Sequence, residues 1–143
     1  MSKLFICLFL LLGLYNCQNY DGAEVYDMIM NEEEDSTSMK INAHKGKEFV
    51  LKFKGNPTLG YTWVLTNPEV VNGPILGLNF GLEGKGDYVP EVTGLLGSGG
   101  SFYFHFKATK VSSLARVLKF SYRRNWEDQE KKVHEFKVLV TVS

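Results

Sequence analysis

The chain has 143 residues, the length of a single domain, and 44% of them are hydrophobic, enough for a sizeable core. Its 16 lysines and arginines balance its 16 aspartates and glutamates, so its charge gives no reason to expect a nucleic acid as partner. No spacing typical of metal ligands occurs, and we expect neither a metal nor a cofactor.

The N-terminal segment predicts a secretory signal peptide over residues 1–17. Lys3 gives it a weakly positive start, and Leu4–Leu14 is almost purely apolar. This apolar stretch has the length of a signal-peptide core and is too short to span a bilayer. A buried N-terminal helix is less favoured, because the stretch has no polar face. We expect cleavage near Cys17, with lipidation of that residue as the minor alternative.

Both cysteines, Cys7 and Cys17, lie in or at the end of this segment. A mature chain therefore has no thiol, or one at its very end, and it has no internal disulfide. It also cannot be a cysteine-dependent enzyme. We expect a monomer in the secretory pathway, either secreted or held in lysosome-like or phagosome-like vesicles, without stable membrane association once the signal is removed.

Residues 18–37 predict an acidic flexible leader, in which a short helix or strand around Val25–Met30 remains an option. The charged run from Asn31 to Ser36 is interpreted as a solvated surface. Residues 38–143 are expected to form the folded domain. A lysine-glycine turn signal, 45–47, interrupts the strand patterns near its start.

Alternation of apolar and polar residues dominates the domain and predicts β-strands. The alternating apolar positions are Met39, Ile41, Ala43, Phe49, Leu51, Phe53, Phe102, Phe104, Phe106, Leu118, Phe120, Tyr122, Phe136, Val138, Val140 and Val142. Another strand is expected at Tyr61–Leu65, with Trp63 in the core, and a short one near Ile75–Phe80 among the glycine-rich loops of 67–100. About seven such strands predict an all-β, immunoglobulin-like antiparallel β-sandwich.

The first unusual loop is Asn-Pro-Thr-Leu-Gly-Tyr, residues 56–61. Pro57 fixes its own φ and favours an extended Asn56, while Gly60 permits a positive φ. The hydroxyl of Thr58 thus lies between two rigid points, in a loop longer and stiffer than a hairpin turn requires. Pro57 also blocks the glycosylation sequon that Asn56 and Thr58 would otherwise form.

The second loop, 96–101, has glycine at 97, 99 and 100, which leaves backbone N–H and C=O groups accessible. A phosphate-binding loop would precede a helix and usually contain a lysine, whereas an alternating strand follows here. Backbone pairing with an extended segment of a partner fits better. A flexible connector is the alternative.

The third loop is Tyr-Arg-Arg-Asn-Trp-Glu, residues 122–127. A tryptophan between two strands and flanked by arginine is typical of a binding anchor. The alternative is that Trp126 belongs to the core, beside a solvated pair of arginines.

Together, the three loops resemble the chagasin family, which are inhibitors of papain-like cysteine proteases. That family carries Asn-Pro-Thr-Thr-Gly-(Phe/Tyr), then Gly-x-Gly-Gly at the start of a strand, then Arg-Pro-(Trp/Phe). The matching stretches here are 56–61, 97–100 and 124–126, in the same order. Leu59 replaces the second threonine and Asn125 replaces the proline. The resemblance extends over residues 38–143, with loops at one end of the sandwich.

The resemblance implies a reversible, non-covalent inhibitor of papain-like (clan CA, cathepsin-like) cysteine proteases, not an enzyme. Thr58 would enter the catalytic cleft, the glycine loop would pair on the non-primed side, and Arg124 and Trp126 would hold the primed side. The implied protease-binding residues are Asn56, Pro57, Thr58, Leu59, Gly60, Tyr61, Gly97, Ser98, Gly99, Gly100, Arg124, Asn125 and Trp126.

Two other classes of function remain open. A secreted immunoglobulin-like adhesion or glycan-binding module would stack sugars on Tyr103 and Trp126. A hydrolase would use carboxylates, although the sequence positions no pair of them. The carboxylates of the long loop are Glu83, Asp87 and Glu91. The histidines His44, His105 and His134 are scattered, and the sequence brings none of them near Ser98 or Ser101.

Overall fold

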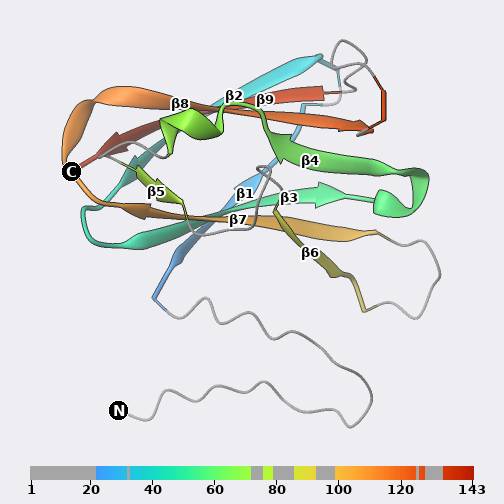
Figure 1. The fold of residues 1–143 in the computed structure, drawn as a ribbon, viewed down its shortest axis with the longest axis horizontal. Coiled ribbons are helices and arrows are strands. Elements are labelled where there is room, and N and C mark those ends of the chain that lie inside the picture. The colour runs from blue at the N-terminus through green and yellow to red at the C-terminus, as the bar shows by residue number, and fades with distance from the viewer. Residues whose placement is uncertain are drawn as a thin grey trace, which may run out of the picture.

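The computed structural model describes residues 22–31, 33–71, 76–78, 86–92, 99–124, 126–127 and 134–143, and the expected signal peptide lies outside them. These residues form two β-sheets packed face to face (Figure 1). The two 3-10 turns among them are η1 (Pro57–Leu59) and η2 (Pro68–Val70). Over this same part of the chain, no helix is long and apolar enough to cross a membrane.

One sheet has the strand order β1-β3-β7-β5, with β6 also pairing with β7, and the other has the order β2-β9-β8-β4. The strands are β1 (Glu24–Met28), β2 (Ser36–Ala43), β3 (Glu48–Gly55), β4 (Tyr61–Leu65), β5 (Leu76–Leu78), β6 (Asp87–Pro90), β7 (Gly100–Ala108), β8 (Ser112–Arg124) and β9 (His134–Val142). The all-β sandwich expected from the alternating patterns is confirmed, and each of those patterns lies on a strand.

The sandwich is not antiparallel throughout. Strand β1 runs parallel to β3, and β2 runs parallel to β9, whereas the other pairs are antiparallel. The reason is that β2, which connects β1 to β3, lies in the opposite sheet. The chain reverses direction twice between β1 and β3, so these two strands point the same way when they meet in one sheet.

The segment expected to be a flexible leader contributes to the sandwich. Strand β1 pairs with β3 from Glu24 opposite Phe49 to Met28 opposite Phe53, and Met28 is buried. Of the short helix or strand considered near Val25–Met30, the structure contains the strand. Strand β2 also starts at Ser36, before the boundary expected at residue 38.

Phe53 lies at the centre of the core, fully buried between the sheets. Its ring centroid lies 4.6 Å from that of Trp63, 4.7 Å from that of Phe120 and 5.5 Å from that of Phe136. Burying one such side chain stabilises a fold by roughly 1.5–3 kcal/mol. Trp63, 0% exposed, is a core residue as predicted.

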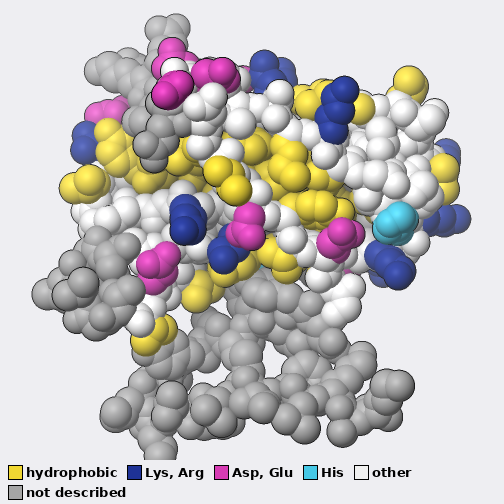
Figure 2. Space-filling model, turned by 180° about the vertical axis from the view of Figure 1, so that it is seen from behind, with side chains coloured by type: hydrophobic (Ala, Val, Ile, Leu, Met, Phe, Trp, Pro, Cys, Tyr) yellow, Lys and Arg dark blue, Asp and Glu magenta, His cyan; other side chains and the backbone are white. Residues whose placement is uncertain are grey.

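The ends of the sandwich differ. The turn from β3 to β4, the start of β7 and the end of β8 lie together at the end drawn on the right in Figure 1. The turn from β2 to β3 lies at the opposite end, where it hydrogen-bonds to the C-terminal Ser143 (Lys45 N–H to Ser143 O, 2.9 Å). Viewed from behind, the molecule shows a band of hydrophobic side chains bordered by charged side chains of both signs (Figure 2).

Candidate inhibitory loops

Strand register brings the three loops together. Gly55, just before the first loop, pairs with Gly100 of the second loop, where β7 starts. Tyr61, at the end of the first loop, pairs with Arg124 at the end of β8. The first loop also crosses from one sheet to the other, because it connects β3 to β4. It is therefore flanked by the second loop on one sheet and by the third loop on the other.

The first loop is folded on itself around Asn56. The Asn56 side chain accepts hydrogen bonds from the Thr58 N–H, at 3.1 Å, and from the Thr58 hydroxyl, at 2.6 Å. The predicted extended Asn56 is found, with φ −132° and ψ 101°. Gly60 adopts φ 85°, the left-handed conformation expected for it, and its N–H donates to Pro57 O at 2.8 Å. Thr58 and Leu59 are exposed at the tip.

Aromatic side chains below the first loop fix its two ends. The Tyr122 hydroxyl accepts a hydrogen bond from the Asn56 N–H at 3.1 Å, and the Trp63 indole N–H donates to Lys54 O at 2.9 Å. The Tyr122 ring stacks on both Tyr61, at 5.3 Å, and Trp63, at 5.1 Å. The return of Tyr61 and Trp63 into the sandwich thus joins the loop to the core.

Trp126 lies against the first loop. A Cβ atom built on Gly60 would lie 2.0 Å from the Trp126 ring, so only glycine leaves room for the indole there. Trp126 is nevertheless 72% exposed, which excludes the alternative that it is a core residue. Leu59, 64% exposed, adds a second large apolar side chain to this end of the sandwich.

Arg124 makes four contacts, two with the first loop and two within the third. Its Nε–H donates to Leu59 O at 3.0 Å, and its Nη1 donates to Glu127 Oε1 at 3.3 Å. The guanidinium carbon lies 4.5 Å from the Tyr61 ring centroid and 6.0 Å from that of Trp126. The side chain that the resemblance assigned to the protease contact is thus engaged with its own loops.

The second loop is described only from Gly99 onward, and Gly97 and Ser98 lie outside the described residues. Gly99 O accepts the Glu91 N–H at 2.9 Å. Gly100 has β3 on one side and β6 on the other, and a Cβ there would lie 2.2 Å from Val89 O. Gly100 is therefore part of the sheet, which places any pairing with a partner strand before it.

A family model described as chagasin family peptidase inhibitor matches residues 42–140, well over half of the chain and all three loops. The chain belongs to the chagasin family. The curated relative Amoebiasin-1, of Entamoeba histolytica, is 31% identical over 101 residues, which cover 69% of this chain and 84% of the relative.

Two solved structures have the same fold as this chagasin-family chain. The cysteine protease inhibitor EhICP2 from Entamoeba histolytica has a TM-score of 0.57 and 16% identity, over 85% of this chain and 95% of that one. PbICP-C, solved in complex with falcipain-2, has a TM-score of 0.56 and 17% identity, over 85% of this chain and 100% of that one. At these identities the likeness concerns the fold alone.

The chagasin family consists of protease inhibitors, so this chain is not an enzyme and the hydrolase alternative is wrong. Asp87 and Glu91 are exposed, and Glu83 lies outside the described residues. Within the described ranges no group of three or more histidine, cysteine or acidic side chains could hold a metal ion.

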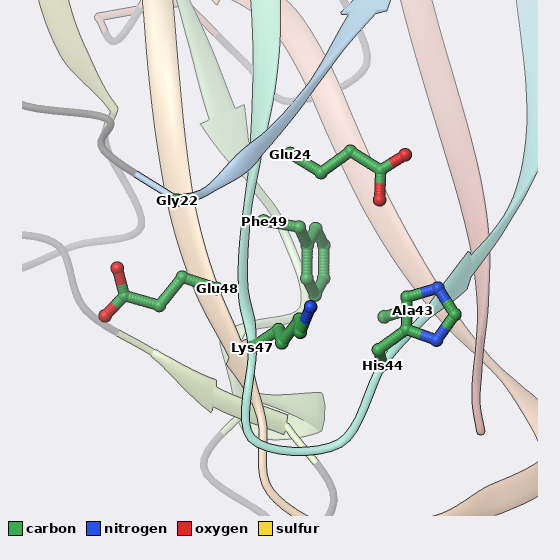
Figure 3. Close-up of a pocket in the computed structure, with 7 residues that line it drawn as sticks. All are labelled: Gly22, Glu24, Ala43, His44, Lys47, Glu48 and Phe49. Carbon is green, nitrogen blue, oxygen red and sulfur yellow. The ribbon is translucent and has the colours of Figure 1, made fainter. Parts of the chain in front are cut away.

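A small cavity of about 130 Å³ lies at the opposite end from the loops, beside the turn from β2 to β3. Lys47 extends towards the Phe49 ring, Glu24 and His44 lie beyond it, and Glu48 points away (Figure 3). The cavity is lined by both acidic and basic side chains, and none of the three loops of the family pattern contributes to it.

Two residues that support the loops were not predicted as site residues. Tyr122 was placed on a strand and at the start of the third loop but not among the site residues, yet its hydroxyl accepts the hydrogen bond from the Asn56 N–H. Glu127 pairs with Arg124, three residues earlier, and its N–H donates to Arg124 O at 3.3 Å. The opposite charges at this spacing were the available signal for the pair. Asn125, between them, lies outside the described residues.

Proposed function

We propose that the three loops form a wedge that fills the active-site cleft of a papain-like cysteine protease, with Thr58 and Leu59 at its tip. The chain is a chagasin-type inhibitor whose partners are cysteine proteases. The wedge assigns that activity to one end of the molecule. One observation carries it: the side chains at the tip are exposed, while the backbone that bears them is held from both sheets.

Rigidity supports inhibition on physical grounds. Ordering a mobile loop on binding costs free energy, so a loop already fixed in its bound shape binds more tightly. The Asn56 cap, the Tyr122 hydroxyl and the Arg124 guanidinium each restrain the first loop before any partner arrives. We propose that binding is reversible and non-covalent, because the wedge contributes shape and hydrogen bonds without supplying a reactive group.

Apolar and polar groups share this end of the sandwich. Exposed aromatic side chains beside an arginine are typical of the few residues that provide most of an interface's affinity. Trp126, on the third loop, and Leu59, on the first, would provide the apolar contact. PbICP-C, which has the same fold, was solved in complex with falcipain-2, and this supports a cysteine protease as the partner of the chain.

Competition for the cleft tests the proposal. Purified protein is titrated into papain, and into papain whose cleft is filled by a covalent peptidyl inhibitor, with heat of binding as the readout. We expect binding to free papain and none to the blocked enzyme. Equal binding to both would show that the protein contacts a surface outside the cleft.

We also propose that the chain enters the secretory pathway, which Lys3 and the apolar stretch Leu4–Leu14 support. The destination is the extracellular medium or a lysosome-like vesicle, where papain-like proteases would be encountered. Mass spectrometry of the protein recovered from expressing cells tests this. Loss of about 17 residues is expected, and recovery with Met1–Cys17 intact would contradict it.

A further inference from the structure

We propose that Arg124 is a positioning residue, which holds the Leu59 carbonyl and thereby keeps the protease from cutting the first loop. This inference rests on the proposed wedge, because it concerns what happens once the tip is in the cleft. It differs from a direct contact with the protease, the role that family resemblance implies for this arginine.

Two carbonyl oxygens of the first loop are hydrogen-bonded within the protein. Leu59 O accepts from Arg124 Nε–H at 3.0 Å, and Pro57 O accepts from Gly60 N–H at 2.8 Å. A protease cuts a peptide bond only when the carbonyl oxygen occupies the site where oxyanion donors stabilise the developing charge. Because Arg124 already binds Leu59 O, the carbonyl oxygen of the bond between Leu59 and Gly60 is held away from the oxyanion donors of the protease.

Arginine suits this role better than lysine. Its planar guanidinium offers several N–H donors in fixed directions and stacks on aromatic rings. Arg124 uses one donor on Leu59 O, a second on Glu127 Oε1 at 3.3 Å, and its face on Tyr61 at 4.5 Å. A lysine could replace one of these contacts but not all of them at once.

The Arg124 guanidinium is also partly buried and already paired with a carboxylate of its own chain, which leaves less of it available to a partner. The Arg124 and Glu127 side chains are 32% and 27% exposed, and they neutralise each other at 3.3 Å. A partly exposed ion pair of this kind contributes little to stability by itself. We infer that Glu127 instead orients the guanidinium, so that Nε points at Leu59 O.

The test compares inhibition with cleavage. Arg124→Gln, Arg124→Lys and the parent are incubated with equimolar papain, and intact mass is followed over hours alongside the inhibition constant. Arg116→Gln, an exposed change towards the other end of β8, is the matched control. We expect both Arg124 variants to bind roughly tenfold or more weakly and to be cut between residues 56 and 61. The parent and Arg116→Gln should stay intact.

Thermal melting confirms that each variant is folded, and Arg124→Lys provides the test if the glutamine variant is not. Two results would overturn the inference: weaker binding by folded Arg124 variants that remain uncut, which would indicate a direct protease contact, or unchanged binding without cleavage. Neither result affects the proposed wedge, which is tested separately by whether the parent competes for the cleft.

Discussion

At the scale of single residues, the hydroxyl of Thr58 has one function inside the first loop and another that is open to a partner. The Thr58 hydroxyl proton is used inside the loop, on the Asn56 side chain at 2.6 Å. The hydroxyl oxygen therefore remains an acceptor for a partner, while its donor function is structural. The sequence identified Thr58 and its two rigid neighbours, but this internal hydrogen bond needed coordinates, because it depends on the φ and ψ of Asn56.

Trp126→Ala should weaken inhibition without unfolding the protein. Trp126 is 72% exposed, so its removal leaves the core intact, yet truncating an exposed aromatic anchor typically costs 2 kcal/mol or more, roughly thirtyfold in affinity. The inhibition constant and the melting temperature are measured together. Unchanged inhibition would mean that the indole serves only to cover Gly60.

At the scale of elements, the first loop depends on a residue without a side chain. Gly60→Ala places a Cβ where the Trp126 ring now lies, on a residue with φ 85°. Strain of this kind costs on the order of 1–3 kcal/mol. We expect a lower melting temperature and weaker inhibition at once, in contrast to Trp126→Ala. Gly46→Ala, which also has a positive φ but lies in the opposite turn with open space around it, should lower only the melting temperature.

Asn125→Pro should strengthen inhibition. Asn125 stands between Arg124 and Trp126, where the family pattern carries proline. A proline there would hold Arg124 in an extended conformation and would narrow the range of unbound loop conformations. Fewer unbound conformations would give about two- to fivefold tighter binding. A fall in both melting temperature and affinity would instead indicate that Asn125 has a backbone conformation proline cannot adopt.

The strand patterns show which elements a sequence can reveal. Phe136, Val138 and Val140 alternate because one face of β9 is buried, and that burial is visible as a period of two. Strand β6, with only four residues, is too short to show a period. The sequence also could not predict that β1 and β2 pair in parallel, because the direction of pairing depends on which sheet each strand joins.

At the scale of the whole molecule, the N-terminal strand β1 links stability to alkaline pH. Burial raises the pKa of Tyr26 to about 12, and a hydrogen bond and the negative charge of Glu24 act in the same direction. The neutral phenol is thus favoured by folding. The stability that Tyr26 contributes is fully present below its ordinary pKa of 10.0 and is lost as pH rises towards about 12.

Tyr26→Phe should flatten this dependence. Urea midpoints of the parent and the variant are compared between about pH 9 and pH 12. The parent should lose stability more steeply than the phenylalanine variant, while losses from lysine titration are common to both. Parallel curves would mean that Tyr26 ionises as easily in the folded protein as in the unfolded chain.

As an inhibitor, the whole molecule depends on the tip of the first loop entering the protease cleft. Replacing Thr58 with arginine puts a long charged side chain there, which would have to lose its hydration in a narrow space. Thr58→Ser keeps the hydroxyl that bonds to Asn56 and is the conservative control. Ser113→Arg adds the same charge at the start of β8, far along that strand from Arg124 and the loops.

The inhibition constant against papain of these three variants and the parent is the most direct test, with melting temperatures to confirm folding. We predict a loss of more than roughly tenfold for Thr58→Arg. Thr58→Ser should change inhibition only mildly, and Ser113→Arg should leave it unchanged. A folded Thr58→Arg protein that inhibits papain as well as the parent would contradict the account, because the tip could not then be inside the cleft.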